Sequence, residues 1–442
     1  MQPAPAQSAP ASAAAPLPHT APLRLRESLQ QLQGEAAFAT RPAPLSQTSP
    51  LAPPAQTALT PPPLPTPTTE QEPFIEGLTD RRLFVRLPEL DPVQLLLERY
   101  VPPEQRPQRD LSGDYHGKNL DALIEAHDWR GVARYSYDAI TQSPPELTSH
   151  ILSHWLLRFH ALLRLRLLPA LAAELANVFV LLPPTSCISP IPAPDLPLFH
   201  PGIPFELHLL AATLPSLVPD GSKTAAVEAL AALLTAAKRE MWRAARARAA
   251  EEERAWRERV ERAAGVLGAV MGEMKATTAQ RALMTSATNP PSALLAALAR
   301  HHYTTGDVAA LAVATSSVSE EASARRAKVL EHVARAEWPD AERELRALVQ
   351  ADPDDLEAHV NLAVVLLYSS ARLDEATSIL TDLLAARPHA GYHAPALLFN
   401  LCTLHELRLD APRAAVEKIR LLVGAAAHGA QGIDAATFKL AL

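Results

Sequence analysis

The sequence is short of glycine, aromatic residues and cysteine. Of its 442 residues, 15 are glycine and 2 are cysteine, and aromatic side chains make up 5%. Cys187 and Cys402 lie far apart in the chain, which excludes a disulfide scaffold and fits a reducing compartment. Alanine and leucine supply most of the apolar content, and both favour helix because they lose little side-chain freedom in it. The composition therefore predicts an all-α protein.

An excess of basic residues is also absent. There are 41 basic and 48 acidic residues, for a formal net charge of -7, so we expect no nucleic-acid partner. The most apolar long stretch, residues 161–184, carries Arg164, Arg166 and Glu174, which predicts a buried helix pair and no direct membrane insertion. No secretory signal is recognisable at the N-terminus. We expect a cytoplasmic protein that reaches membranes through partners.

Proline is abundant, with 42 residues, but it is clustered. Residues 1–73 are rich in Pro, Ala, Ser and Thr, which predicts a disordered tail. Residues 74–118 are expected to be a linker with a short helix that starts at Asp91. A second cluster, at 183–204, predicts a long surface loop inside the helical region. Such a loop is either disordered or used for contact, and its anchoring side chains favour contact: Phe199, Ile203 and Phe205.

One apolar spacing, a small residue followed by large ones at i+4 and i+7, occurs three times between residues 341 and 422. The first two occurrences lie 35 residues apart and the last two 39 apart, and the pair Asn361-Leu362 recurs as Asn400-Leu401 with the same offset of 39. A helical spacing repeated at these intervals predicts an α-solenoid of helical hairpins over residues 119–442. The three sets are Ala341, Leu345 and Leu348; Ala376, Leu380 and Leu383; and Ala415, Ile419 and Leu422.

Each part of a unit has a physical role. The small residue lets the two helices of a hairpin approach, a bulky residue packs the hairpin turn, and a proline ends the second helix. Helix is predicted over 205–217 and 223–275, and a terminal helix over 434–442 is predicted to cover the last apolar edge. The candidate repeat-defining or protein-binding residues are Trp129, Phe205, Trp256, Trp338, Ala341, Pro353, Asn361, Leu362, Ala376, Pro388, Leu398, Phe399, Asn400 and Leu401.

Motifs that would indicate catalysis are not found. Residues 113–118, Gly-Asp-Tyr-His-Gly-Lys, have three residues between the glycines where a phosphate-binding loop needs four, and Asn119 follows in place of Ser or Thr. Among the 16 histidines no ligand set is evident, and His389 and His393 have no third ligand near them in sequence. Cys402 is expected to pack in a helix. We therefore predict a protein that is not an enzyme and holds no cofactor or metal, with a site assembled from distant residues as the alternative.

The repeats resemble tetratricopeptide repeats. The match covers a first helix at 361–368, a second helix at 376–384, and Pro388. Ala363 stands where glycine is common in that family, and one extra residue lies in the turn before Leu373. This resemblance implies protein–protein binding and nothing more specific.

Residues 396–407 resemble the last repeat of the subunit 12 family of the TRAPP (transport protein particle) tethering complex. In that family a Leu-Phe-Asn-Leu run precedes an aromatic residue, which His405 replaces here, and a Glu-Leu pair. Further segments match in the same order over about 120–442: Leu147–His150 with Trp155 and Arg158, Pro204-Phe205 with Leu209-Leu210, Trp256-Arg257, Asn361–Val364, and Leu366–Tyr368.

That resemblance implies a non-catalytic scaffold subunit, which docks through its helices onto core and accessory TRAPP subunits. The core is an exchange factor for Rab GTPases in ER-to-Golgi traffic and autophagy, so a Rab GTPase is an indirect partner. The expected location is peripheral, at the ER–Golgi intermediate compartment or the Golgi. The alternative is a general repeat adaptor or co-chaperone. A co-chaperone needs basic clamp residues, and His359, Ala363 and Leu366 stand at those positions.

Overall fold

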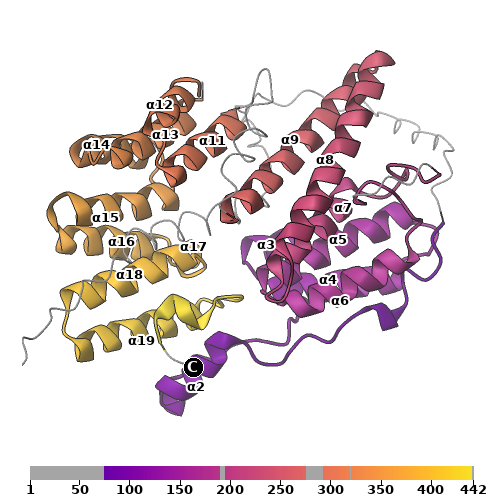
Figure 1. Cartoon of the computed structure of the whole chain (residues 1–442). Coiled ribbons are helices and arrows are strands. Elements are labelled where there is room, and N and C mark those ends of the chain that lie inside the picture. Colours follow the sequence, from indigo (N-terminus) through magenta and orange to yellow (C-terminus); the bar gives the residue numbers. More distant parts are fainter. Residues whose placement is uncertain (1–73, 190–194, 275–291, 319, 441–442) are drawn as a thin grey trace, which may run out of the picture. The chain divides into compact units, whose positions relative to one another are not determined.

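A computed structural model describes residues 74–189, 195–274, 292–318 and 320–440 (Figure 1). The predicted tail at 1–73 lies outside the described residues, as does part of the 183–204 loop. Within the described ranges the chain forms helices and no β-strand. The predicted all-α fold of helical hairpins is therefore confirmed.

The helices before residue 275 pack mainly against their neighbours in sequence. Asn119 and Asp128 cap two of them, since each side chain accepts a hydrogen bond from a backbone N–H three residues later. Pro169 stands in the first turn of another, as its position in the sequence predicts. These helices are α3 (Leu120–Glu125), α4 (Trp129–Gln142), α5 (Thr148–Arg164), α6 (Leu168–Leu181), α7 (Phe205–Leu217), α8 (Lys223–Arg246) and α9 (Ala250–Glu273).

The helices after residue 291 include the three predicted units. In the first two units the small residue and the large ones of the second helix are buried, with Ala341 and Ala376 at 0% exposure. In the third unit the prediction needs correction, because Ala414 and Leu422 are buried while Ala415 and Ile419 are half-buried. The elements are α11 (Ser292–Thr305), α12 (Val308–Ser316), α13 (Glu321–Ala334), α14 (Trp338–Ala351), α15 (Leu356–Ser370), α16 (Leu373–Ala386), α17 (Pro388–Tyr392), α18 (Pro395–Arg408) and α19 (Ala411–Ala427), followed by a 3₁₀ helix, η3 (Ala435–Phe438).

Many of the hairpins have the same type of turn, in which a residue with left-handed backbone conformation (positive φ) follows the first helix. The next backbone N–H then bonds back across the turn, as from Asp128 to the Leu123 carbonyl at 2.9 Å. In the turn before Leu373 the bond runs from Arg372 to Leu366 and spans one residue more, which accounts for the extra residue noted in the sequence. The left-handed turn residues of these hairpins are His127, Arg166, Arg248, Gly306, Ala336 and Ala371.

Three details of the sequence prediction need correction. The predicted helical span 223–275 is two helices, because the chain reverses through a left-handed residue at Arg248, and α8 packs along α9. The interval of 39 residues between the last two units, against 35 between the first two, predicts a loop with four extra residues around His389–Pro395, but this segment contains the short helix α17. In the described part of the predicted terminal helix over 434–442 there is a single 3₁₀ turn, Ala435–Phe438, which buries Phe438 completely.

The segment before α3, predicted as a linker with a short helix, packs against two separate groups of helices. Asp91 caps the predicted helix α2 (Pro92–Tyr100) and accepts a hydrogen bond from the Gln94 N–H at 2.8 Å. Earlier in the segment, the ring of Phe84 stacks on Trp155 with centroids 4.3 Å apart, and the Trp155 indole N–H donates to the Leu78 carbonyl at 3.0 Å. These contacts hold residues 75–87 against α5.

A buried ion pair fixes this segment. Arg158 of α5 and Glu174 of α6 are 3% and 0% exposed and form two hydrogen bonds of 2.6 Å. The Arg158 guanidinium also donates to the carbonyls of Ala133 and Val85, and Glu174 accepts from the Val85 N–H at 2.8 Å. The pair therefore links α4, α5 and α6 to the segment at Val85, and every one of these contacts is buried or part-buried.

The helix α2 packs against α19, far along the chain. Its apolar residues belong to the same buried cluster as those of the repeats. Arg109 binds both carboxylate oxygens of Asp91, at 2.6 and 2.8 Å, and also donates to the Ala430 carbonyl at 2.8 Å. Gln431 bonds the Arg130 N–H at 2.9 Å, so the turn after α19 also contacts α4.

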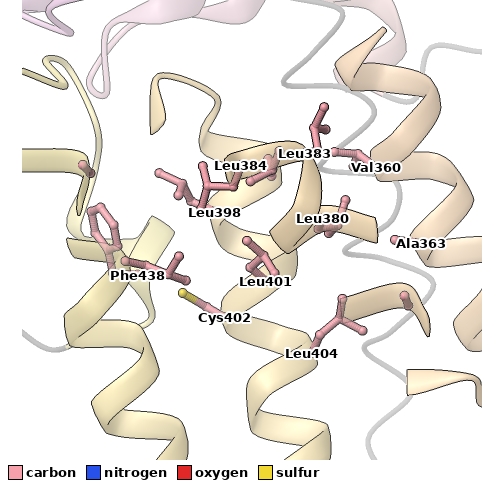
Figure 2. Packing of buried hydrophobic residues seen from close by; sticks show 14 of the residues in the cluster. Val360, Ala363, Leu380, Leu383, Leu384, Leu398, Leu401, Cys402, Leu404 and Phe438 are labelled. Atoms are coloured by element: carbon pink, nitrogen blue, oxygen red, sulfur yellow. The ribbon is translucent and has the colours of Figure 1, made fainter. Parts of the chain in front are cut away.

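The core of the last two units is formed by leucines of neighbouring helices. Figure 2 shows Leu398, Leu401 and Cys402 of α18 lying between the α16 leucines and Phe438 of η3. All of these side chains are at most 6% exposed. Leu398 and Leu401, the first and last residues of this segment, are therefore core residues.

We expect Glu174→Gln to destabilise the protein strongly, because it leaves the Arg158 charge buried without its counter-charge. The expected loss of unfolding free energy is about 3–5 kcal/mol. Denaturation followed by circular dichroism measures it. Glu89→Gln is the matched control, since the Arg86–Glu89 pair is 86% and 78% exposed and such pairs contribute about 0–1 kcal/mol. Equal effects of the two substitutions would contradict a structural role for the buried pair.

Candidate protein-binding sites

The fourteen sequence-predicted residues divide by exposure. Half of them are buried and hold helices together, with at most 8% of each residue exposed: Phe205, Trp256, Ala341, Leu362, Ala376, Leu398 and Leu401. Six are half-buried and Pro353 is exposed; the half-buried ones are Trp129, Trp338, Asn361, Pro388, Phe399 and Asn400. A partner that binds the repeats can contact only this second group.

Two asparagines occupy equivalent places on the first helices of consecutive units. Asn361 lies on α15 and Asn400 on α18, and these two helices contact each other. Each amide offers a donor and an acceptor, which suits recognition of a peptide backbone or a polar side chain. Beside Asn400, the ammonium of Lys439 lies 5.6 Å from the centre of the Phe399 ring. An amide and an aromatic group of α18 and the cationic group that follows η3 therefore occur close together.

An aromatic pair lies at another edge of the repeats. Trp338 opens α14 and stacks on Tyr368 of α15, with centroids 5.4 Å apart and ring planes at 15°. Tyr368 is 39% exposed, and burial of the rest of its side chain raises the pKa of its hydroxyl. Tryptophan and tyrosine are enriched at protein interfaces because they offer a large rigid surface at little entropic cost.

The structure brings together Phe205 and Trp256 with the proline-rich loop. Residues 197–206 form one wall of a cavity of about 780 Å³, and side chains of α8 and α9 form the other. Phe199 lies 4.8 Å from Trp256 and 5.9 Å from Phe205, between ring centroids. The described part of the loop is therefore anchored to α7 and α9, and its use for contact with a partner stays a prediction.

Charged groups surround the aromatic floor of this cavity. The Arg259 guanidinium lies 4.4 Å from the Trp256 ring centre, and Glu206 pairs with Arg262 at 2.5 Å. A cavity with an aromatic floor and a mixed-charge rim suits an apolar side chain on an extended peptide. Sequence reasoning found both aromatic residues but could not place them together.

The phosphate-loop-like stretch shows a local role for its lysine. The Lys118 ammonium lies 3.4 Å from the Asp128 carboxylate, which already caps α4. Gly113 has φ of 70°, and a Cβ there would lie 2.8 Å from the Arg130 carbonyl oxygen. This loop therefore packs against the start of α4.

One group of metal-capable side chains lies close together within the described residues. His332, Glu337 and Asp340 place one ligand atom each within 4.8 Å of one another. The imidazole of His332 is 2.7 Å from Glu337, and Asp340 pairs with Arg343 at 2.7 Å. These contacts close the turn between α13 and α14, so the group has a structural explanation.

The sequence places no third ligand near His389 and His393, but the fold brings a third histidine close to them in space. The ring of His127, from the turn between α3 and α4, lies 5.4 Å from His389 and 4.8 Å from His393. No sequence signal indicated this, because the contact joins opposite parts of the chain.

Both cysteines are buried. Cys402 is 0% exposed, and burial raises the pKa of its thiol to about 12. Burial also raises the pKa of Cys187. Thiolate is the reactive form, so neither side chain is suited to act as a nucleophile.

No helix among the described residues combines the length and apolarity that crossing a bilayer requires. In comparisons with protein-family models, curated proteins and solved structures, no significant match to this chain is found.

We predict that neither thiol reacts with a water-soluble disulfide reagent in the folded protein. Both should react after denaturation, because their raised pKa values and their lack of exposure are properties of the folded state. A spectrophotometric thiol titration with and without denaturant measures this. Rapid reaction of Cys402 in the native protein would contradict its burial between α18 and η3.

Proposed function

We propose that this chain is a non-catalytic scaffold subunit of a TRAPP-type vesicle-tethering complex, which docks through its helical repeats. The observation that carries the proposal is the ordered resemblance over about 120–442, centred on the Leu398–Leu401 segment. The all-α hairpin fold is compatible with it, because stacked helical hairpins form extended surfaces for binding proteins.

Ion pairs between neighbouring units support a scaffold role. On the second helices, Arg346 of α14 binds Glu375 of α16 at 2.6 Å, and Arg372 pairs with Glu342. Arg346 also binds Glu342 at 2.8 Å, so the four charges form one network. Networks hold their geometry better than isolated surface pairs, so adjacent units present their surfaces in a fixed relation.

A second set of ion pairs joins other parts of successive units. Arg326 of α13 binds Asp355, the N-cap of α15, at 2.6 Å. Arg408 of α18 pairs with Asp374 of α16 at 2.5 Å. A partner that binds across two units would meet a surface that needs little ordering, which lowers the entropic cost of binding.

We place the docking surface on the first helices, around Asn361 and Asn400. Both side chains are half-buried and lie on helices that touch, so one extended segment can contact both. The partners under this proposal are TRAPP core and accessory subunits, with a Rab GTPase as an indirect partner. The location would be peripheral at the ER–Golgi intermediate compartment or the Golgi.

Affinity purification of the full chain from eukaryotic cells, with mass spectrometry, tests the proposal. We expect small TRAPP core subunits and a large accessory subunit to co-purify. Purification without any core subunit would overturn it. The co-chaperone alternative predicts tight binding to an acidic C-terminal chaperone peptide. Ala363 and Leu366, two of the positions considered for a basic clamp, are buried and cannot contact such a peptide.

We predict that the double variant Asn361→Ala, Asn400→Ala captures core subunits about tenfold less well. The loss corresponds to about 1.4 kcal/mol, since two polar contacts are removed while the core stays intact. Quantitative pull-down measures it. Gln350→Ala, at an exposed position of the second helix α14, is the control and should bind as the unmodified chain does. Equal capture by both variants would move the docking surface away from the asparagines.

A further inference from the structure

Three histidines from two distant segments meet in a cluster. His127 lies in the turn between α3 and α4, His389 lies in α17, and His393 follows the end of α17. Ring centroids are 4.5 Å apart for His389 and His393, 4.8 Å for His127 and His393, and 5.4 Å for His127 and His389. Every pair of rings is therefore in contact or close to it.

Two of the three have the spacing of a helical metal-binding pair. His389 and His393 are four residues apart, which places both imidazoles on one side of the turn. The His393 Nδ1 atom lies 2.7 Å from the His389 carbonyl, which places its proton there and leaves a lone pair on Nε2. That Nε2 atom is buried and has no hydrogen-bond partner. The Gly429 carbonyl raises the pKa of the ring but lies outside hydrogen-bond geometry.

Burial disfavours the charged form of two of the rings. Burial lowers the pKa of His127 to about 4, and it also lowers the pKa of His393. The charge that acts on His127 from outside the cluster is that of Arg164, whose guanidinium lies 5.5 Å from the Trp129 ring centre. Outside the cluster, His428 also lowers the pKa of His393, and the His428 ring is stacked on Tyr392. Neutral imidazole is the form that ligates metals.

We propose that His127, His389 and His393 form a binding site for a transition-metal dication of the zinc class. Three imidazole nitrogens suit Zn²⁺, Co²⁺, Ni²⁺ or Cu²⁺, whereas Mg²⁺ and Ca²⁺ prefer oxygen ligands. A fourth ligand would be water. In the structure the rings are stacked, with planes at 15° to 30°, and their nitrogens do not meet the 4.8 Å spacing found in the His332 group, so binding one ion requires the rings to rotate about their side-chain bonds.

A metal ion in this place would link the turn between α3 and α4 to α17. The turn between α3 and α4 already contacts the turn after α19, since the amide N–H of Gln431 donates to Asp128 at 3.2 Å. Metal binding would therefore strengthen an existing contact between early and late parts of the chain. The site does not depend on the proposed function, because no partner protein contributes to it.

Isothermal titration of the untagged full chain with Zn²⁺ alone, at pH 7, tests the site. The variants are His389→Ala and His127→Asn, the latter chosen because φ of His127 is 49° and asparagine tolerates left-handed backbone. The matched control is His150→Ala on α5. His150 and His154 have the same spacing and a ring distance of 4.3 Å, but the third ring beside them is Tyr135.

We expect one Zn²⁺ per chain, with affinity reduced about 100-fold or more in both cluster variants, since even the loss of a group that orients a ligand costs 10- to 100-fold. His150→Ala should bind as the unmodified chain does, and Zn²⁺ should raise the melting temperature only where the cluster is intact. Circular dichroism confirms that each variant is folded. Absence of binding, or unchanged binding in both cluster variants, would overturn the proposal. So would loss of binding in His332→Ala, which would assign the ion to the group at the α13–α14 turn.

Discussion

A helical hairpin cannot bury all of its apolar surface by itself, and the whole structure depends on this constraint. Each helix of the repeats has one side against its partner and another that must meet the next unit. The buried cluster accordingly runs without interruption from Val329 of α13 to Phe438 of η3. Small residues such as Ala341 and Ala376, both 0% exposed, set how closely the helices approach. Removing any unit would expose apolar surface on its neighbours.

The same constraint explains the arrangement around α19. A side of α19 that could receive another hairpin is taken by α2 and η3. Two lysines fix η3 and α19 to α18, since Lys418 and Lys439 both bind Glu406. The adjoining turn fits closely, because a Cβ on Gly432 would lie 1.9 Å from the Arg164 carbonyl oxygen. Covering α19 thus involves residues from both ends of the described chain.

Local features could be predicted from the sequence and long-range ones could not. The spacing of Ala341, Leu345 and Leu348 predicts a buried helix face, and Asp91 with Pro92 predicts the start of α2, because each signal lies within one or two turns. The reversal at Arg248 carries no such signal, since neither glycine nor proline marks it and packing against α9 decides it. The meeting of His127 with His389 depends on how separate helices stack, which no local pattern encodes.

For the candidate sites too, the sequence indicates individual residues, whereas only the fold shows which of them lie together. Phe205 and Trp256 could be selected as bulky residues beside a proline-rich loop, yet only packing shows that they share one cavity with Phe199. Most other selected residues are buried, because residues that define a repeat are mainly those that its core requires. The half-exposed positions between them are the ones that a partner could reach, and their chemistry is free to vary without cost to the fold. Repeat spacing therefore predicts architecture well and binding surfaces poorly.

The segment at 74–118 packs against two separate buried cores and so contributes to both. Its first part packs with α5 and α6 through Trp155 and the Arg158–Glu174 pair, and its helix α2 packs with α19. A truncation that removed this segment would expose apolar surface in both cores and leave the Arg158 charge without two of its contacts. Loss of partner binding after such a truncation would therefore have two indistinguishable causes, unfolding of the cores or removal of a docking surface. Point substitutions at half-exposed positions of α15 and α18 separate the two causes, because they leave both cores intact.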